Sequence, residues 1–487
     1  MSEFHNTTPL IPGFFSDPTI CRAGDDFFIA NSSFEYFPGA PVHRSRDLVD
    51  WELIGNVVSR PTQTDLVSGG DSSGIFGSTI RFHAGRFWFI TTNILEVQQG
   101  QLLFTADDPA GPWSDPVRVP VMGIDPDIAW DDEGHCFVTW CGFPHGISQV
   151  RIDDASGALL SEPIAMWKGT GMRNPEGPHL FHVGAYWYLM IAEGGTDRGH
   201  SVSIARGPAP EGPWEGFEGN PILTHRSSAH PVQSVGHADL VEGPGGQWVA
   251  VYHGTRPNGV FPQFHLIGRE TMMAPVEWID GWPRIMEAAA EPRPARTAFV
   301  EDFTRPLGPR WVSPSGAMAG VSVSGAGLVL DAVAGARPVV ARVQDLEWSA
   351  TATIDVAAGA ARMVLYLGAG HWYGVEVHGR TATAVSKVGP FEQRFGSHLL
   401  PGDGALQLRI SASVPAARPN GWPANEPDFV SLACLDGDAV IELARLDGRY
   451  LSTEVAGGFT GRTVGMWALS GRVTVRDFAY AVNDGTA

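Results

Sequence analysis

Five short segments ending in Ile or Leu recur along the first 290 residues and constrain the fold more than any other feature. They are "DPTI" (17–20), "GSTI" (77–80), "DPDI" (125–128), "GPHL" (177–180) and "HADL" (237–240). Each is followed by a glycine and then by an aromatic or β-branched run such as "FWFITTN" or "YWYLMIA". A strand, a glycine turn and a second strand at a period of about 50 residues is typical of propeller blades. The pattern predicts a five-bladed β-propeller.

The repeat also predicts which side chains share the centre of the propeller. The innermost strand of each blade lines the central channel, so residues at one repeat position face one axis. Those at the first position are Asp17, Gly77, Asp125, Gly177 and His237. Glu176, between two prolines in "NPEGPH", suits a rigid loop end and neither a helix nor a central strand. We expect Glu176 at the channel mouth, together with the two aspartates.

The pattern changes near residue 284, where a second domain is expected to follow. A Pro- and Ala-rich bridge at 287–297 leads into short strand-like runs separated by Gly and Pro turns. Examples are "GLVLDAV", "ATATIDV", "ARMVLYLG" and "TVGMWAL". Such runs predict a β-sandwich, here of jelly-roll-like form. The expected fold is therefore all-β, with a propeller at 1–296 and a β-sandwich at 297–487.

Composition narrows the classes of partner. The 53 acidic and 33 basic residues give a formal charge of −20, which disfavours nucleic acid and anionic membranes and leaves neutral substrates. The N-terminus "MSEFHNTTPLIPGFF" lacks the basic and apolar regions of a secretion signal, so a cytoplasmic location is expected. No CxxC pair links Cys21, Cys136, Cys141 and Cys434. We expect reduced cysteines and no zinc site.

The acids at the channel mouth indicate a particular chemistry. Glycoside hydrolysis needs one carboxyl group that donates a proton and a second that acts as base or nucleophile, and Asp17, Asp125 and Glu176 supply three candidates. A third carboxylate near the acid would raise the pKa of that acid. Any one Asp-Pro pair could instead start a strand or cap a turn. Three acids in equivalent register favour the catalytic interpretation.

The chain resembles glycoside hydrolase family 43 over nearly its whole length. The resemblance rests on the segments that carry the three acids and on "PEGPHLF", "GHADLV", "LIGRETMMAPVEWIDGWP" and "GGFTGRTVGMWA". The resemblance is to the β-xylosidase and α-L-arabinofuranosidase type. It implies an inverting, exo-acting enzyme that releases terminal β-D-xylose or α-L-arabinofuranose from plant-cell-wall oligosaccharides such as xylooligosaccharides. It also implies a five-bladed catalytic propeller with a C-terminal β-sandwich.

The resemblance implies a role for each matching residue. Asp17 in "SDPTI" matches the general base, Asp125 in "GIDPD" the pKa-modulating aspartate, and Glu176 in "PEGPH" the general acid. Arg269 in "GRET" matches an arginine that contacts sugar hydroxyls. Phe34 in "SSFEYF" matches an aromatic wall of the subsite for the non-reducing end. The chemistry implied by these roles needs no cofactor.

Two further matches concern the channel and the sandwich. His237 in "GHADL" matches a histidine that in many members lies beside a bound calcium or water, so a structural calcium in the channel is considered. Phe459 in "GGFTGRTVG" suits an exposed loop tip, and an aromatic ring there is expected to dock against another surface. The matching phenylalanine of related enzymes reaches into the propeller mouth. The sandwich at 297–487 is therefore expected to complete the active-site pocket.

The chain departs from the family pattern at one place and is ambiguous at another. Where many bacterial β-xylosidases carry a segment resembling "GIWAP", this chain has "GIFGST", with Phe76 and Gly77 in the expected pocket wall. The sequence leaves the preference between xyloside and arabinofuranoside substrates open. It also leaves open whether the chain associates into a homo-oligomer. In "DPD", Asp127 competes with Asp125, and the repeat register favours Asp125.

Other functional classes fit less well. A retaining enzyme of the sucrose-hydrolysing type would be expected to show an "RDP" stretch and a Glu-Cys pair, and neither is present. A non-catalytic sugar-binding propeller would need no matched acid and base. The GxSxG pattern "GDSSG" at 70–74 lacks a clear preceding strand and following helix, so it is interpreted as a surface loop rather than a serine-hydrolase elbow.

Overall fold

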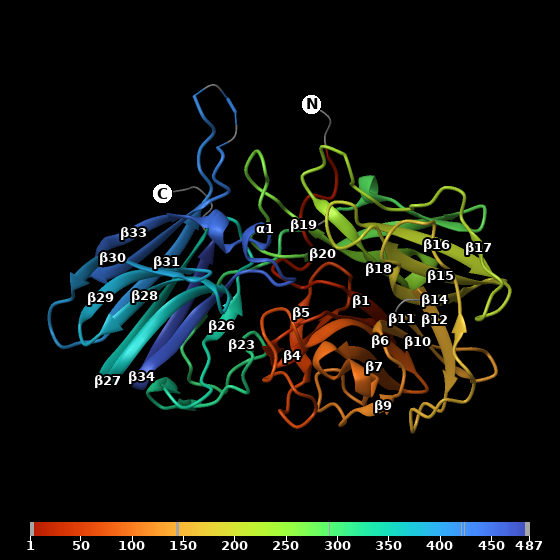
Figure 1. The fold of residues 1–487 in the computed structure, drawn as a ribbon, viewed down its shortest axis with the longest axis horizontal. Helices are drawn as coiled ribbons and strands as arrows, with labels where there is room; N and C mark the ends of the chain where they lie inside the picture. The colour runs from red at the N-terminus through yellow and green to blue at the C-terminus, as the bar shows by residue number, and fades with distance from the viewer. Residues whose placement is uncertain (1–3, 143–145, 292, 420, 423, 483–487) are drawn as a thin grey trace.

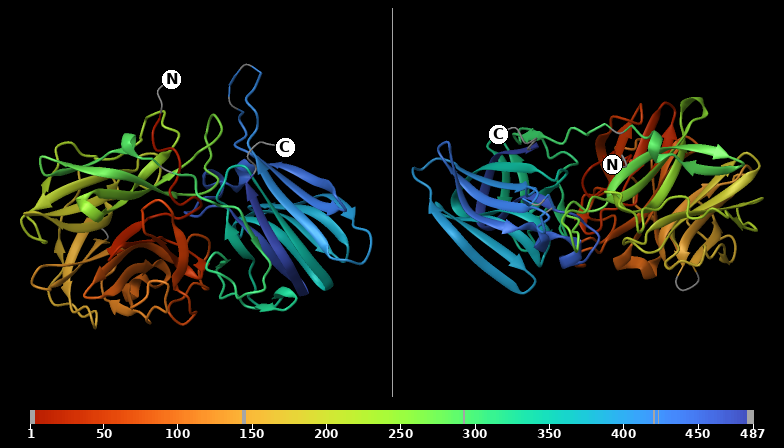
Figure 2. Two further views of the ribbon diagram at one scale, coloured as in Figure 1. Left: turned by 180° about the vertical axis from the view of Figure 1, so that it is seen from behind. Right: turned by 90° about the horizontal axis from the view of Figure 1, so that it is seen from above.

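The chain folds into two all-β units that lie side by side, shown at the right and left of Figure 1. The computed structural model describes residues 4–142, 146–291, 293–419, 421–422 and 424–482. Figure 2 shows the same two units from behind and from above. Within these ranges, no helix is long and apolar enough to cross a membrane.

The first unit consists of five sheets, each of four antiparallel strands in chain order. The first two sheets contain β1 (Thr19–Ala23), β2 (Asp26–Ala30), β4 (Gly39–Ser45), β5 (Glu52–Val58), β6 (Ile75–His83), β7 (Arg86–Asn93), β8 (Gln101–Ala106) and β9 (Val117–Val119). The third and fourth contain β10 (Ile124–Trp130), β11 (Cys136–Gly142), β12 (Gly146–Ile152), β13 (Ile164–Ala165), β14 (Glu176–Val183), β15 (Tyr186–Glu193), β16 (Ser201–Gly207) and β17 (Glu215–Gly216). The fifth contains β18 (Gln233–Glu242), β19 (Trp248–Thr255), β20 (Glu270–Ile279) and β21 (Trp282–Ile285).

The first strands of the five sheets close into a ring. β6 lies beside β1 and β10, β14 lies beside β10 and β18, and β18 returns to β1. Each turn between the first two strands carries a predicted glycine, and the apolar runs that follow form buried second strands. Packing between neighbouring sheets buries these runs, which is why each blade needs the next. The predicted five-bladed propeller is confirmed.

The second unit is a β-sandwich, as the sequence predicts, and it is built on the two long strands β27 (Trp348–Gly368) and β34 (Thr463–Val482). Its other strands are β22 (Phe299–Glu301), β24 (Val321–Ser324), β25 (Gly327–Asp331), β26 (Val339–Arg342), β28 (His371–His378), β29 (Thr381–Val388), β30 (Phe391–Leu399), β31 (Leu406–Ser413), β32 (Phe429–Asp436) and β33 (Ala439–Asp447). The sequence predicts separate strands for "ATATIDV" and "ARMVLYLG", but both lie in β27. Register shifts against β34, between Asp355 and Ala358 and between Ala360 and Ala361, let one strand bend without a turn.

Short elements complete the structure. They are β3 (Tyr36–Phe37), β23 (Ser313–Pro314), η1 (Ile94–Gln99), η2 (Pro244–Gly246), η3 (Glu287–Ala289), η4 (Gly448–Leu451) and α1 (Thr453–Ala456). Of these, β3 belongs to the propeller segment and β23 to the sandwich segment, and the two strands pair with each other. Phe14 and Tyr36 also share one buried cluster with Val340, Tyr366 and Trp372 of the sandwich. The two units are therefore joined by backbone pairing and by a common apolar core.

Candidate active site

The inner strands begin with an irregular backbone that orients the residues of the first repeat position. Asp17, Asp125 and His237 have φ of 50°, 53° and 50°, and Gly177 has φ of 54°. The ladders of β6, β10, β14 and β18 show register shifts at these points. A left-handed residue at a bulge turns its side chain away from the regular pleat, at a cost of about 1–3 kcal/mol when it is not glycine. Such strain is typical of functional positions.

These side chains meet at one pocket. Its lining residues are Asp17, Phe34, Phe76, Gly77, Ile124, Asp125, Glu176, Thr196, His237, Arg269 and Phe459. The structure thus brings together every site residue that the sequence singles out. Glu176 is the first residue of β14, although its two flanking prolines were expected to exclude a strand. The register shift between Glu176 and His179 explains the difference, because Pro178 falls where no ladder hydrogen bond is required.

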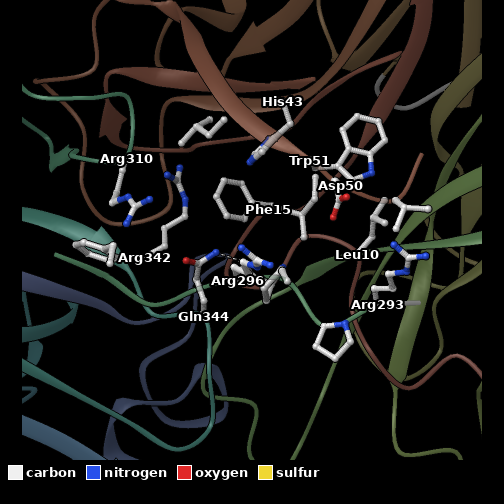
Figure 3. A pocket seen from close by; sticks show the side chains of 17 residues that line it. Leu10, Phe15, His43, Asp50, Trp51, Arg293, Arg296, Arg310, Arg342 and Gln344 are labelled. Carbon is white, nitrogen blue, oxygen red and sulfur yellow. Dashed lines mark hydrogen bonds between the residues drawn. The ribbon is translucent and has the colours of Figure 1, made fainter. Parts of the chain in front are cut away.

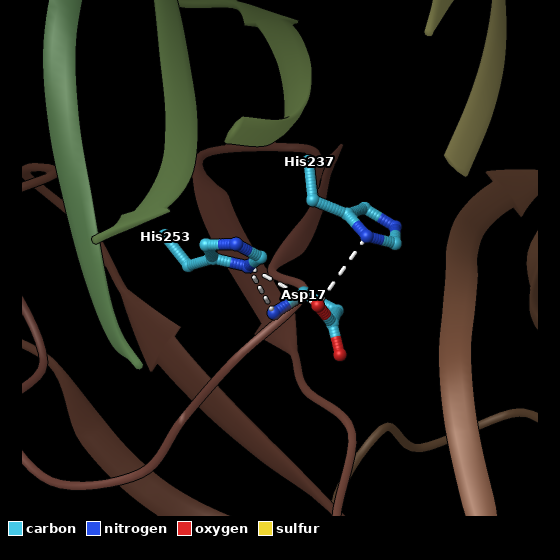
Figure 4. Close-up of side chains that lie close together, drawn as sticks. All are labelled: Asp17, His237 and His253. Atoms are coloured by element: carbon cyan, nitrogen blue, oxygen red, sulfur yellow. Dashed lines mark hydrogen bonds and ion pairs between the residues drawn. The ribbon is translucent and has the colours of Figure 1, made fainter. Parts of the chain in front are cut away.

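Asp17 is held as a carboxylate. Arg269 donates from Nη1 to Asp17 Oδ1 at 2.6 Å, Ser32 donates from Oγ to Oδ2 at 2.6 Å, and His237 Nδ1 lies 3.3 Å from Oδ1. Burial alone would raise the pKa of Asp17, but the charges of Arg269 and His237 hold it well below its usual value. Figure 4 shows Asp17 between two imidazoles. The second, His253, accepts a hydrogen bond at Nδ1 from the Asp17 amide at 3.2 Å.

Glu176 has the opposite tendency. Burial and then the negative charge of Asp125 raise the pKa of Glu176 to about 7, against the smaller effect of His237. The pKa of Asp125 is also raised, chiefly by burial. Thr196 donates to Glu176 Oε1 at 3.4 Å. One pocket therefore holds an ionised carboxylate and a carboxyl group that retains its proton to near neutral pH, the combination that acid–base hydrolysis of a glycoside uses.

Three phenylalanines form the apolar wall of the pocket. Phe459 stacks on Phe34, with ring centroids 5.6 Å apart, and meets Phe76 edge to face at 5.9 Å. The guanidinium carbon of Arg269 lies 5.6 Å from the ring centroids of both Phe34 and Phe459. Phe459 follows α1 in the sandwich segment and is 37% exposed. An aromatic wall beside fixed hydrogen-bonding groups suits a sugar, which has apolar ring faces and polar edges.

Two glycines make room for His237 at the centre. A Cβ atom on Gly77 would lie 2.5 Å from Asp125 Oδ1 and 2.9 Å from His237 Cε1. A Cβ atom on Gly177 would lie 2.7 Å from His237 Nε2. Asp17 raises the pKa of His237 to about 9, overcoming the opposing effect of burial. The central imidazole is therefore a cation at neutral pH, surrounded by three acids.

A second ring of polar residues lies two positions further along the repeat. Arg81 Nη2 donates to Asp127 Oδ1 at 3.0 Å, and Arg81 Nη1 donates to Asp239 Oδ2 at 2.8 Å. Thr19 Oγ1 donates to the same oxygen of Asp239 at 2.7 Å, and Leu180 N donates to Asp127 Oδ2 at 3.0 Å. Asp127 therefore joins blades together. Its carboxylate is engaged outside the pocket of Asp125.

Sequence reasoning missed Arg81 and Asp239, as well as Thr196 at the acid. Asp239 could have been found, because it occupies the same repeat position as Asp127. Arg81 carries no repeat signal. It lies four residues after Gly77, on the same strand, and only the folded ring shows that it reaches both aspartates.

The "GDSSG" loop supports the phenylalanine wall. Ser72 accepts a hydrogen bond at Oγ from the Phe459 amide at 2.8 Å, and its own amide donates to Glu35 Oε2 at 3.0 Å. Burial raises the pKa of Glu35 to about 8. Asp71 accepts from the Ala369 amide at 2.9 Å, which ties the loop to the sandwich. The loop therefore positions Phe459 rather than supplying a serine nucleophile.

The channel residues do not fit calcium. Asp17, His237 and His253 offer three ligand atoms within 4.8 Å of one another. Calcium prefers six to eight oxygen ligands, whereas this set has one carboxylate and two imidazoles. Asp17 is already paired with Arg269, and the guanidinium of Arg81 already pairs with both Asp127 and Asp239. The described residues thus supply cations of their own where calcium was considered.

Comparison with known proteins agrees with this geometry. Residues 6–283 match the family model described as "Glycosyl hydrolases family 43", and residues 305–481 match "Beta xylosidase C-terminal Concanavalin A-like domain". The chain is 43% identical over 282 residues to a non-reducing end α-L-arabinofuranosidase from Bacteroides ovatus, covering 57% of this chain and 53% of that protein. It is 42% identical over 292 residues to a xylosidase/arabinosidase from Butyrivibrio fibrisolvens, covering 56% and 55%. The chain thus spans about half the length of these curated relatives.

A solved structure extends the similarity over the sandwich. The Bacteroides ovatus xyloglucan PUL GH43B superposes with a TM-score of 0.87 at 30% identity, covering 99% of this chain and 100% of that one. The agreement therefore includes both units and their relative placement. Because the family model matches residues 6–283, more than half of the chain, the chain belongs to glycosyl hydrolase family 43.

Proposed function

We propose that the chain is an exo-acting, inverting glycoside hydrolase. It releases terminal pentose, β-D-xylose or α-L-arabinofuranose, from plant-cell-wall oligosaccharides such as xylooligosaccharides. The observation that carries this proposal is the meeting of Asp17, Asp125 and Glu176 in one pocket, where neighbouring charges lower the pKa of Asp17 and burial raises the pKa of Glu176 to about 7. The names of the two curated relatives support the pentose substrate.

In this reaction Asp17 is the general base and Glu176 the general acid. A water oxygen attacks the anomeric carbon while its proton passes to the Asp17 carboxylate. The bond from that carbon to the glycosidic oxygen breaks, and Glu176 gives its proton to the departing oxygen. Asp125 keeps the Glu176 proton in place by its negative charge. Single displacement inverts the anomeric configuration, so the carboxyl groups of Asp17 and Glu176 are expected roughly 6.5–9.5 Å apart.

The remaining pocket residues bind the terminal sugar. Phe34, Phe76 and Phe459 contact its apolar face, and Arg269 donates hydrogen bonds to its hydroxyls while it holds Asp17. His237 fills the centre beneath the sugar as a cation. We also propose that the propeller spans 1–296 and the sandwich 297–487, the latter completing the pocket through Phe459.

Arabinofuranosidase activity is the second candidate. The observation that favours it is the 43% identity to a protein named as a non-reducing end α-L-arabinofuranosidase. Gly77 leaves the pocket wall without a side chain beside Asp125, which alters the space around the sugar. The reacting atoms of a β-D-xyloside and an α-L-arabinofuranoside can occupy similar positions, so measured rates on the two substrates decide between the two activities.

The test is a comparison of kcat/KM on aryl β-D-xyloside and aryl α-L-arabinofuranoside, with proton NMR of the first-formed sugar. We expect measurable hydrolysis of at least one substrate and a product of inverted anomeric configuration. Retained configuration would contradict the assigned base, because a nucleophilic carboxylate would then be required. Absence of hydrolysis, with sugar binding retained, would instead favour a non-catalytic propeller.

A further inference from the structure

A second, larger cavity lies between the two units and shares no lining residue with the acid pocket. It encloses about 610 Å³. Figure 3 shows its walls, which come from the N-terminal segment, the first blade, the connection after η3 and the sandwich. Its lining includes the aromatic and basic side chains of Phe15, His43, Trp51, Arg296, Arg310 and Arg342.

Arg342 is the unusual member of this cavity. It is 4% exposed, and its Nε donates to the Phe14 carbonyl at 3.0 Å. Its guanidinium carbon lies 4.4 Å and 4.6 Å from the ring centroids of Phe14 and Phe15. Nη2 is buried without a hydrogen-bond partner, and no ion pair joins Arg342 to a carboxylate among the described residues. A buried charge without a counter-ion is unfavourable, so the site favours an anion from outside the chain.

The other polar groups of the cavity reinforce this preference. Arg310 lies over the Phe299 ring at 3.8 Å, and neither Arg310 nor Arg296 forms an ion pair in the described part of the chain, although the charge of Glu301 acts on Arg310. His43 is buried with Nδ1 unpartnered, and burial together with Arg342 lowers its pKa to about 3, so it adds a polar ring nitrogen to the cavity and no charge. Asp50 is the one acid among the residues that line the cavity. Cations therefore gather here in a chain whose formal charge is −20.

We propose that this cavity is a binding site for a small oxyanion, a carboxylate or phosphate, held by Arg342 and Arg310. Guanidinium groups bind both anions through paired, charge-assisted hydrogen bonds. The cavity volume leaves room for a ring attached to the anion, and Trp51 lines the cavity with an aromatic side chain that a sugar ring can contact. A carboxylated sugar therefore fits as well as free phosphate. Because the walls come from both units, a bound anion stabilises their docking.

Isothermal titration calorimetry of the full chain tests the proposal with sodium glucuronate, inorganic phosphate and neutral glucose. We expect at least one anion to bind about ten-fold or more tightly than glucose, since hydrogen bonds to charged groups are the stronger ones. Binding of glucuronate alone would indicate a site for a carboxylated sugar, and binding of phosphate alone would indicate a site for free phosphate. Binding of both would indicate that the site recognises the oxyanion that they share. All three results support the site.

Variants separate this cavity from the acid pocket. Arg310→Gln, at a position more exposed than that of Arg342, is expected to weaken anion binding about ten-fold, and Arg342→Gln at least as much. Arg445→Gln is the matched control, because Arg445 also lies over a phenylalanine ring, at 4.9 Å from Phe429, but away from the cavity. No anion binding by the unaltered chain, or binding unchanged in Arg310→Gln, overturns the proposal, even if Arg342→Gln fails to fold.

Discussion

At the scale of single residues, Asp17 and Glu176 show how one pocket keeps two carboxyl groups in different states. Both are largely enclosed, so burial alone would raise the pKa of each. The difference comes from neighbours: Arg269 and His237 stabilise the Asp17 carboxylate, whereas Asp125 disfavours ionisation of Glu176. The pKa difference between these two carboxyl groups therefore depends on contacts between blades, not on the residue type.

This division leads to a prediction about leaving groups. Glu176→Ala should lower kcat/KM about 10²–10⁴-fold on xylobiose, whose departing oxygen needs a proton, and far less on an activated aryl glycoside. Asp17→Ala should slow both substrates to a similar extent, because both need an activated water. Initial rates on the two substrates check this. Equal losses across both substrates in both variants would contradict the assignment of acid and base.

Arg81 is a structural counterpart to this chemistry. Its guanidinium lies between Asp127 and Asp239, which are essentially inaccessible to solvent. Arg81→Met keeps most of the stem but leaves two buried carboxylates without their cation, so we expect the free energy of unfolding to fall by about 3–5 kcal/mol. Urea denaturation measures the change. Arg86→Met is the control, since Arg86 is 46% exposed and its 3.7 Å contact with Asp107 is expected to contribute under about 1 kcal/mol. Similar losses in the two variants would show that Arg81 is not needed for charge balance.

At the scale of elements, the sequence predicts strands better than it predicts their ends. The paired runs in each blade are visible because apolar strands and glycine turns are local signals. The bulges at which Asp125, Glu176 and His237 enter the inner strands are set by neighbouring blades, and no local pattern shows them. For the same reason, β27 runs through a position where a turn was expected, between "ATATIDV" and "ARMVLYLG".

The loop that carries Phe459 belongs to this scale. Its amide is bound by Ser72 of the propeller segment, and its ring stacks on Phe34. Phe459→Ala should leave the melting temperature nearly unchanged, because the ring is partly exposed, and should raise KM roughly 2–10-fold through lost aromatic contact with the sugar. Steady-state kinetics and thermal denaturation test both parts. Phe391→Ala, at an exposed ring of the sandwich, serves as control. An unchanged KM in Phe459→Ala would show that the sandwich does not contribute to substrate binding through Phe459.

At the scale of the whole molecule, the sequence predicts the architecture but not the ion pairs and hydrogen bonds that form between blades and between units. Five similar segments imply five blades, and equivalent register brings Asp17 and Asp125 to one axis, with Glu176 one residue before the equivalent position of its blade. Residues outside the repeat, such as Arg81 and Arg342, find their partners only across blades or units. Their roles depend on distances that a sequence pattern does not contain. The preference between xyloside and arabinofuranoside depends on pocket shape at the same level of detail.

The joint between the two units makes the propeller depend on the sandwich for its stability. Pairing of β3 with β23, hydrogen bonding of Arg342 to the Phe14 carbonyl and the shared cluster around Tyr36 all bridge the boundary. A chain ending at residue 296 would lose the apolar partners of Phe14 and Tyr36, both of which are buried. Exposing such rings costs about 25 cal/mol for each Å² of apolar surface.

We therefore expect the propeller alone to aggregate or unfold, and to show no measurable hydrolysis of xylobiose. Size-exclusion chromatography, circular dichroism and kcat/KM on short oligosaccharides are the measurements. Phe459→Ala in the full chain keeps the joint and removes only the pocket contact, so comparing the two separates loss of folding from loss of substrate binding. A soluble, monomeric 1–296 chain with full kcat/KM would show that the sandwich neither stabilises the propeller nor completes its pocket.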